Sequence, residues 1–187
     1  HWSPLAEGIF AFVLFDFWMY AWHRANHQIP FLWRFHRMHH SDLELDSTSA
    51  LRFHTGEIIL SSLLRLVVIP LIGMQFIHLL IYEICLQPVI IFHHSNVALP
   101  ERLDRIFRTV IVTPNMHRVH HSQVKDETDS NYSSIFSFWD RMIWSFRKRK
   151  DTRTLVYGLP YLQEREWQSI WGMLRTPLVN IQRKPTK

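Results

Sequence analysis

Histidine recurs in this chain at spacings that few folds can accommodate. The motif His-x-x-His-His occurs twice, at His36–His40 and at His117–His121, and a His-x-x-x-His pair at His23 and His27 precedes both. On a helix, residues three and four positions apart lie on one face. Each motif therefore presents its imidazoles together, as two facing trios that the pair can complete. The fold has to bring three distant segments into one place.

These clusters predict a metal centre with two ions. The chain has 13 histidines among 187 residues, and neutral imidazole is the commonest metal ligand in proteins. A purely structural role would require many ionisable rings to be buried side by side, which is costly. Eight ligands exceed the four of a zinc site but suit two six-coordinate ions; imidazole also binds iron, copper and nickel, so the spacing does not choose the metal. The predicted ligands are His23, His27, His36, His39, His40, His117, His120 and His121.

A long apolar stretch separates the two triple motifs. Between Ile58 and Phe92 the only charged residues are Arg65 and Glu83, and residues 66–82 carry no charge. That uncharged run is at the short limit for a membrane span. Because Pro70 and Gly73 interrupt it, we expect two helices that enter the bilayer and return to the same side. A buried helix pair in a soluble bundle is the alternative.

The remaining pattern is also helical. Residues 5–28 read as a helix with apolar and aromatic side chains around a polar line, and Pro30 begins a second short helix. We therefore expect an all-α fold, an integral membrane helical bundle with a cytosolic, histidine-rich cap that holds the dimetal site. The polar line at helical spacing consists of Asp16, Tyr20, His23 and His27.

Length and composition predict one domain. The chain is long enough for a single core and leaves little room for a second. We expect one domain over residues 1–187, with a catalytic core of about 11–160 and an amphipathic tail over 161–187, whose apolar face packs on the domain or lies at the membrane interface. The chain begins with His and not Met, so we expect a truncated N-terminus. The apolar face of the tail comprises Trp167, Ile170, Trp171 and Leu174.

The charge distribution favours a membrane partner. The net charge is +5, and basic residues concentrate at Arg102, Arg105 and Arg108 and in the run 147–150. Basic runs beside apolar segments suit anionic lipid headgroups and the positive-inside tendency. Zinc-finger cysteines, an RNP-like aromatic motif and a long basic helix are all missing from the sequence, which excludes nucleic acid as the expected partner.

Other polar residues are expected to orient the histidines. A metal-bound imidazole needs an acceptor for its second N–H, and carboxylates or carbonyls supply one. For Asp16 the alternative is a hydrogen bond between helices, and for His54 a hydrogen bond in the core. The candidates for this supporting role are Asp16, Tyr20, His54, His93, Asn131 and Asp140.

Missing motifs narrow the chemistry. The sequence contains no Glu-x-x-His, which characterises ferritin-like di-iron sites, and no His-Glu-x-x-His, which characterises many metalloproteases. It also contains no glycine-rich dinucleotide or phosphate-binding motif. If the site performs redox chemistry, its electrons have to come from another protein.

The ordered motifs resemble those of the fatty acid hydroxylase and sterol desaturase superfamily, the integral membrane di-iron oxygenases. The RFH and HHSN forms are most similar to the bacterial-type sterol desaturase branch, near the alkylglycerol monooxygenase-like members. The resembling segments are LFDFWMYAWHRANH (14–27), WRFHRMHHSD (33–42), ALRFHTGE (50–57), FHHSN (92–96), TPNMHRVHHS (113–122), NY (131–132), FWDR (138–141) and YGLP (157–160).

The resemblance implies O2-dependent hydroxylation or desaturation of an unactivated C–H bond in a lipid of sterol, fatty acyl or alkylglycerol type. It assigns two iron ions, which zinc can replace, to the eight histidines and adds His94 as a ninth ligand; it assigns no catalytic residue beyond the metal centre. It also implies histidine boxes that face the cytoplasm, where a ferredoxin or a cytochrome b5-like donor docks on the basic surface.

Two departures from the family pattern lie near the histidines. The family commonly has Asn-Tyr-Gly-Gly where this chain has Asn131-Tyr132-Ser133-Ser134, and Gly-Thr-Phe/Tyr where it has Trp144-Ser145-Phe146. Only glycine adopts left-handed conformations freely, so a tight turn beside the site could differ. The alternatives to a lipid oxygenase are a membrane zinc-dependent hydrolase and a metal-binding homologue that has lost catalysis.

Overall fold

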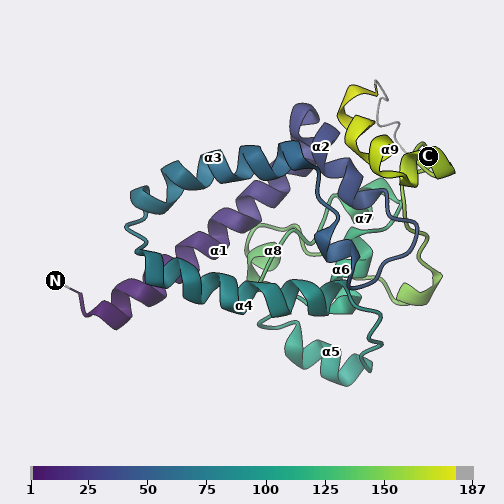
Figure 1. Cartoon of the computed structure of the whole chain (residues 1–187). Coiled ribbons are helices and arrows are strands. Elements are labelled where there is room, and N and C mark those ends of the chain that lie inside the picture. Colours follow the sequence, from purple (N-terminus) through teal and green to yellow (C-terminus); the bar gives the residue numbers. More distant parts are fainter. Residues whose placement is uncertain (1, 180–187) are drawn as a thin grey trace.

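The computed structural model describes residues 2–179, and within this range it contains helices and no strands (Figure 1). The predicted all-α fold is confirmed. The α-helices are α1 (Pro4–Gln28), α2 (Pro30–His40), α3 (Thr55–Leu71), α4 (Phe76–His94), α5 (Glu101–Phe107), α6 (Pro114–His120), α7 (Lys125–Thr128), α8 (Phe138–Met142) and α9 (Ile170–Arg175). The 3-10 turns are η1 (Ser49–Leu51), η2 (Thr152–Thr154), η3 (Arg165–Gln168) and η4 (Thr176–Leu178).

Proline sets the boundary between the first two helices. Ser3 caps α1 by accepting a hydrogen bond from the amide of Ala6. Ile29 has φ −92° and ψ 114°, which is extended backbone, because the ring of Pro30 excludes the helical conformation for the residue before it. Pro30 then begins α2 at the position that needs no N–H donor. A single non-helical residue therefore separates two histidine-bearing helices.

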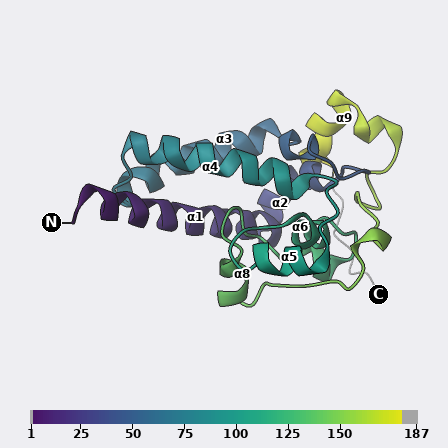
Figure 2. The same cartoon turned by 90° about the horizontal axis from the view of Figure 1, so that it is seen from below.

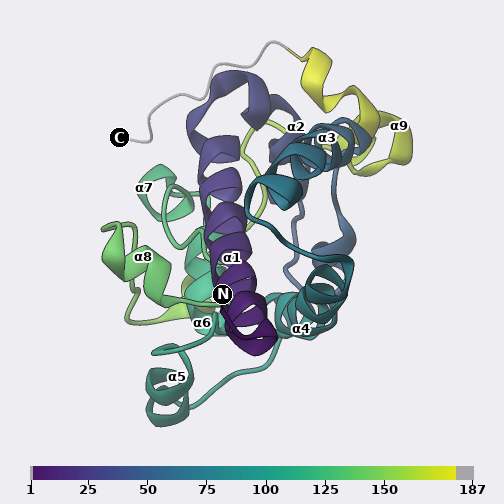
Figure 3. The same ribbon diagram turned by 90° about the vertical axis from the view of Figure 1, so that its left-hand side faces the viewer.

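Helices α3 and α4 form the predicted hairpin. The chain reverses after α3 at Gly73, which has φ +68° and is therefore in the left-handed region that glycine adopts freely. Figures 1 and 2 show that α3 and α4 both extend along the length of α1, with most of the short helices gathered toward the end opposite to the N-terminus. Figure 3, which looks down α1, places α3 and α4 on one side of it and α5 to α8 on the other.

Helices α1 and α4 are long and apolar enough to cross a membrane. Only 22% of the apolar window in α1 and 17% of that in α4 is buried inside the protein. The core helix of a soluble bundle would bury most of such a surface. The exposed apolar surface of α1 and α4 therefore favours lipid as their surroundings.

Asp16 joins α1 to its neighbours. Its carboxylate accepts hydrogen bonds from the Tyr82 hydroxyl and the Trp139 indole, both at 2.8 Å, and from the amides of Ile135 and Phe136. Asp16 thus links α1 to α4, to α8 and to the segment before α8, beside the cluster that contains Phe15 and Leu86. The hydrogen bond between helices, which the sequence left as the alternative for Asp16, is the one found.

The C-terminal segment packs on α2, but only in part as predicted. Buried Arg37 donates to the carbonyls of Thr176 and Val179, and Trp167 packs against the cluster around Trp33. The four residues of the predicted apolar face do not share one helix, because Ser169 has extended backbone and starts α9 by capping Gly172.

As a result, two apolar residues of the predicted face lie at the surface. Ile170 is 71% exposed and Trp171 is 76% exposed. Gly172 allows the tight reversal, since a Cβ there would stand 2.0 Å from the carbonyl oxygen of Glu166. Residues 180–187 of the predicted tail lie outside the described range.

Candidate metal centre

The structure brings all nine predicted ligands together in two adjacent groups. In each group the candidate ligand atoms lie within 4.8 Å of one another, and eight of the nine residues are buried. Helices α1, α2, α4 and α6 supply them. The first group is His23, His27, His36, His40 and His120, and the second is His39, His94, His117 and His121.

Each His-x-x-His-His motif contributes to both groups. In α2, His36 and His40 belong to the first group and His39 to the second. In and after α6 the assignment is reversed, with His117 and His121 in the second group and His120 in the first. The i and i+4 imidazoles stay together because they lie one turn apart, and the i+3 imidazole turns to the other group. The repeated motif therefore matches two metal positions and not one.

Three histidines of the first group are held through Nδ1. His36 Nδ1 lies 2.8 Å from Glu57 Oε1, His23 Nδ1 lies 2.8 Å from the Tyr132 carbonyl oxygen, and His120 Nδ1 lies 2.7 Å from the Ser130 carbonyl oxygen. An oxygen acceptor requires the proton on Nδ1, which leaves a lone pair on Nε2. These three Nε2 atoms are buried and have no hydrogen-bond partner among the described residues. A metal ion is the partner that this arrangement fits.

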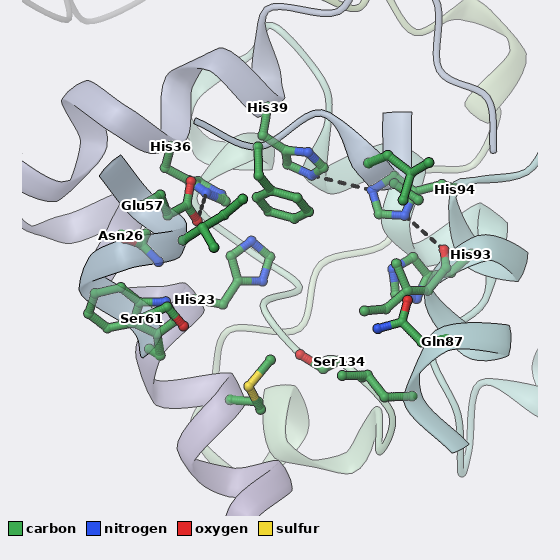
Figure 4. A pocket seen from close by; sticks show the side chains of 18 of the residues that line it. His23, Asn26, His36, His39, Glu57, Ser61, Gln87, His93, His94 and Ser134 are labelled. Atoms are coloured by element: carbon green, nitrogen blue, oxygen red, sulfur yellow. Dashed lines mark hydrogen bonds and ion pairs between the residues drawn. The ribbon is translucent and has the colours of Figure 1, made fainter. Parts of the chain in front are cut away.

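In the second group, Nε2 atoms converge. His94 Nε2 lies 3.3 Å from His39 Nε2 and 3.0 Å from His117 Nε2, and the latter lies 3.1 Å from His121 Nε2 (Figure 4 draws the His39–His94 contact). Nitrogen ligands about 2.1 Å from one ion lie about 3.0–3.4 Å apart at octahedral or tetrahedral angles. The observed spacing is that of ligands around a single ion. His94 Nδ1 is held 2.8 Å from the Ile90 carbonyl oxygen, which leaves Nε2 to bind metal.

Burial keeps the cap imidazoles neutral. The pKa values of His39, His40, His117, His120 and His121 are held well below the ordinary 6.5, first by burial and then by the neighbouring imidazoles. Both effects disfavour the protonated ring. Neutral imidazole is the form that ligates metal, so these five histidines are in the metal-binding form at neutral pH.

Asn131 and Asp140 support the site through the loop that carries the acceptor carbonyls. Asp140 accepts from the amides of Tyr132 at 2.8 Å and Ser133 at 3.0 Å; burial raises its pKa, and these hydrogen bonds oppose the rise. Asn131 has φ 55° and donates to the carbonyl of Met116 at 3.0 Å. These residues fix the loop that accepts from His23 and His120, so their effect on the imidazoles is indirect.

The other predicted supporting residues have different neighbours. Tyr20 bonds to Ser145 Oγ at 2.8 Å, and Asp16 lies seven residues, about 10 Å, before His23 along α1. His54 caps α3 through Gly56 and contacts the Leu174 carbonyl at 3.0 Å, as expected for a core hydrogen bond. His93 packs against His117 with ring centroids 4.1 Å apart but belongs to neither group.

Sequence reasoning missed two carboxylates that contact the histidines. Glu57, buried in the first turn of α3, bonds to His36, and Asp129 Oδ1 lies 3.5 Å from His27 Nδ1. Glu57 could have been identified from its position directly before a long apolar stretch. A carboxylate that is buried at such a position needs a polar partner.

A cavity of about 400 Å³ opens between the histidines and helices α1, α3 and α4. Figure 4 shows His36, Glu57 and His23 along one wall and His93, His94 and Gln87 along the opposite one. Apolar side chains, including Trp22, Phe53 and Leu86, form much of the remaining lining. The cavity has room for a segment of an apolar molecule beside the two groups.

Comparisons with known proteins agree with this geometry. The model of the fatty acid hydroxylase family matches residues 8–145. An alkylglycerol monooxygenase of Caenorhabditis elegans is 31% identical over 84% of this chain and 30% of its own length. An ornithine lipid hydroxylase of Rhizobium tropici is 30% identical over 78% of this chain and 43% of its own length, and a cholesterol 25-hydroxylase of Rattus norvegicus is 22% identical over 82% and 51%.

The chain spans less than half the length of the first two of these relatives. No solved structure matches it. The family match nevertheless covers most of the chain, including every histidine of the two groups. The chain therefore belongs to the fatty acid hydroxylase family.

Proposed function

We propose that the chain catalyses O2-dependent hydroxylation or desaturation of an unactivated C–H bond in a lipid at a di-iron centre. The observation that carries the proposal is the pair of buried histidine groups that border a cavity with apolar walls. The names of the relatives, which are lipid hydroxylases and monooxygenases, support the same reaction class. We assign metal ligation to the nine grouped histidines.

Iron ions, when bound, supply the redox chemistry with O2. Hydroxylation places one oxygen atom in the C–H bond and releases the other as water, at the expense of two electrons and two protons. Desaturation uses the same O2, electrons and protons, removes two hydrogen atoms from the lipid and releases two water molecules. Residues 1–187 contain no dinucleotide-binding motif, so we propose that a donor outside these residues supplies the electrons.

The residues of the chain position and shield this chemistry. Glu57 and the carbonyls of Ser130 and Tyr132 fix the ring orientation of three ligands, which holds the lone pairs of Nε2 toward the metal. Apolar walls around the cavity exclude water and seat the lipid chain beside the histidines. The substrate is a lipid of sterol, fatty acyl or alkylglycerol type.

A basic surface is available for an electron donor. Lys148 pairs with Glu101 on α5, and Arg108 pairs with the same carboxylate, so the two basic runs predicted from the sequence meet at one place. We place this surface and the histidine cap on the cytoplasmic side, where an acidic ferredoxin or cytochrome b5-like donor can dock by charge complementarity.

Lipid analysis of a host that carries single-histidine variants tests the proposal. His39→Ala and His120→Ala remove one imidazole from each group and should each abolish the oxidised lipid product. His78→Ala is the matched control, since His78 lies at the start of α4 away from both groups, and it should retain the product. If the lipids of the three variant strains and of a strain without the protein all equal those of the wild-type strain, the chain is a non-catalytic homologue.

A further inference from the structure

Two charged residues lie in the cavity wall away from the histidines. Arg65 of α3 and Glu83 of α4 form an ion pair in which Nη1 and Oε1 are 2.8 Å apart. Both line the cavity that the histidines border. They are the only charged residues between Ile58 and Phe92, so an otherwise apolar hairpin places its two charges in one cavity.

The ion pair leaves hydrogen-bonding capacity unused. Arg65 Nε is buried and has no hydrogen-bond partner among the described residues, and its Nη2 lies 3.3 Å from the sulfur of Met19. The guanidinium also lies over the rings of Phe15 and Trp18, 5.6 and 5.8 Å from their centroids, contacts that use no N–H donor in the ring plane. Glu83 Oε2 accepts a long hydrogen bond, 3.4 Å, from Gln87. Ser61 also lines this part of the cavity. The ion pair therefore adds unused donors and acceptors to the cavity wall at a place away from the histidines.

Holding the hairpin together does not explain this pair. Charged side chains within membrane helices are costly, and they commonly mark a ligand pathway or site. Well-packed apolar side chains join two helices at least as effectively as a buried ion pair. A pair that lines a cavity and keeps unused donors and acceptors is instead suited to contact a polar group of the molecule inside it.

The helical rise gives the distance from this pair to the histidines. Arg65 follows Glu57, the partner of His36, by eight residues on α3, which is about 12 Å along the axis. Glu83 precedes His94 by eleven residues on α4, which is about 16 Å. If the polar group of a substrate contacts Arg65 and Glu83, the part of the substrate that reaches the histidine groups lies about 12–16 Å from that polar group.

We infer that Arg65 and Glu83 bind the hydroxyl group of a lipid alcohol whose oxidised carbon lies about 12–16 Å from that hydroxyl. A hydroxyl can donate to Glu83 and accept from Arg65 at the same time. An anionic group would meet the carboxylate of Glu83, and a cationic group would meet the guanidinium of Arg65, so the pair selects a neutral polar group. The choice of oxidised carbon rests on the proposed function, whereas binding of the alcohol does not.

Three probes of equal chain length test the inference: hexadecan-1-ol, its methyl ether 1-methoxyhexadecane, and hexadecane. Equilibrium binding of the radiolabelled probes to the full chain in neutral detergent should be at least about tenfold tighter for the alcohol than for the ether, because the ether cannot donate to Glu83. In the iron-loaded protein with a chemical reductant, the alcohol should be oxidised at carbons remote from the hydroxyl, and hexadecane without such a preference.

The double variant Arg65→Leu with Glu83→Leu removes both charges and leaves neither unpaired. It should bind the alcohol about tenfold more weakly and hexadecane as the wild type does. The matched control is Asp151→Leu with Arg153→Leu, which removes an exposed ion pair outside the cavity and should leave alcohol binding unchanged. The comparison of alcohol with ether in the wild type keeps the test valid if the double variant fails to fold.

The outcomes separate the two proposals. Equal affinity for all three probes, with oxidation at the same carbons, would overturn the inference and leave the proposed function standing. Selective binding of the alcohol without oxidation of any probe would support the inference and count against the proposed function.

Discussion

Trp144 has a backbone conformation that its side chain disfavours. Its φ is 55° and its side chain is 93% exposed, at one of the positions where the family commonly has glycine. The turn beside Asp140 is retained, since the amides of Ser145 and Phe146 both bond to the Asp140 carbonyl. The turn therefore holds a non-glycine residue in the left-handed region.

Trp144→Gly should stabilise the protein. Glycine removes a left-handed strain of about 1 kcal/mol, and the exposed indole contributes little burial. We expect the free energy of unfolding to rise by about 1 kcal/mol, measured by denaturant unfolding in detergent. Trp171→Gly is the control, because Trp171 is an exposed tryptophan inside α9 where glycine is unfavourable. A loss of stability in Trp144→Gly would show that the turn is not strained.

Glu57 is a positioning residue for His36. Glu57→Leu leaves Nδ1 of His36 without its acceptor, and removal of such a partner weakens metal affinity about 10–100-fold. Glu57→Gln keeps an oxygen at the same place and should recover most of the affinity. Metal retained against a chelator, measured by elemental analysis, distinguishes the two variants. Equal retention in Leu, Gln and wild-type proteins would mean that Glu57 does not orient the ligand.

Among the helices, the boundaries and the hairpin could be predicted, because proline and helical spacing determine them. Pro30 placed the boundary of α1 and α2, and the interrupted apolar stretch predicted the hairpin. The division of each His-x-x-His-His motif between two groups could not be predicted, because it depends on how α2 and α6 pack. The partner of Asp16 was likewise beyond the sequence, since Trp139 lies more than a hundred residues away.

The buried guanidinium of Arg37 is one of the groups that hold the C-terminal segment. Arg37→Met removes the hydrogen bonds to the carbonyls of Thr176 and Val179 and should lower the free energy of unfolding by about 2–3 kcal/mol. We also expect faster limited proteolysis within α9 and η4. Arg34→Met, on the exposed side of the same helix, should behave as the wild type. Equal cleavage rates for Arg37→Met and Arg34→Met would show that Arg37 does not hold the C-terminal segment in place.

At the scale of the molecule, two unlike parts are joined. Helices α1, α3 and α4 expose apolar side chains along most of their length, and the cap of short helices buries histidines at one end. The composition of the whole chain averages these two parts and therefore does not reveal them. In the sequence, only the position of the apolar stretch indicates the division. The cavity lies where the two parts meet, which is the place that the proposed lipid substrate requires.

We propose that the two groups of histidines hold two metal ions. Elemental analysis of anaerobically purified, catalytically active protein tests it most directly. We predict two iron ions per chain, with a loss of iron in His39→Ala and in His120→Ala, which remove one ligand from each group. An active preparation that contains one zinc ion per chain and no iron would contradict the account.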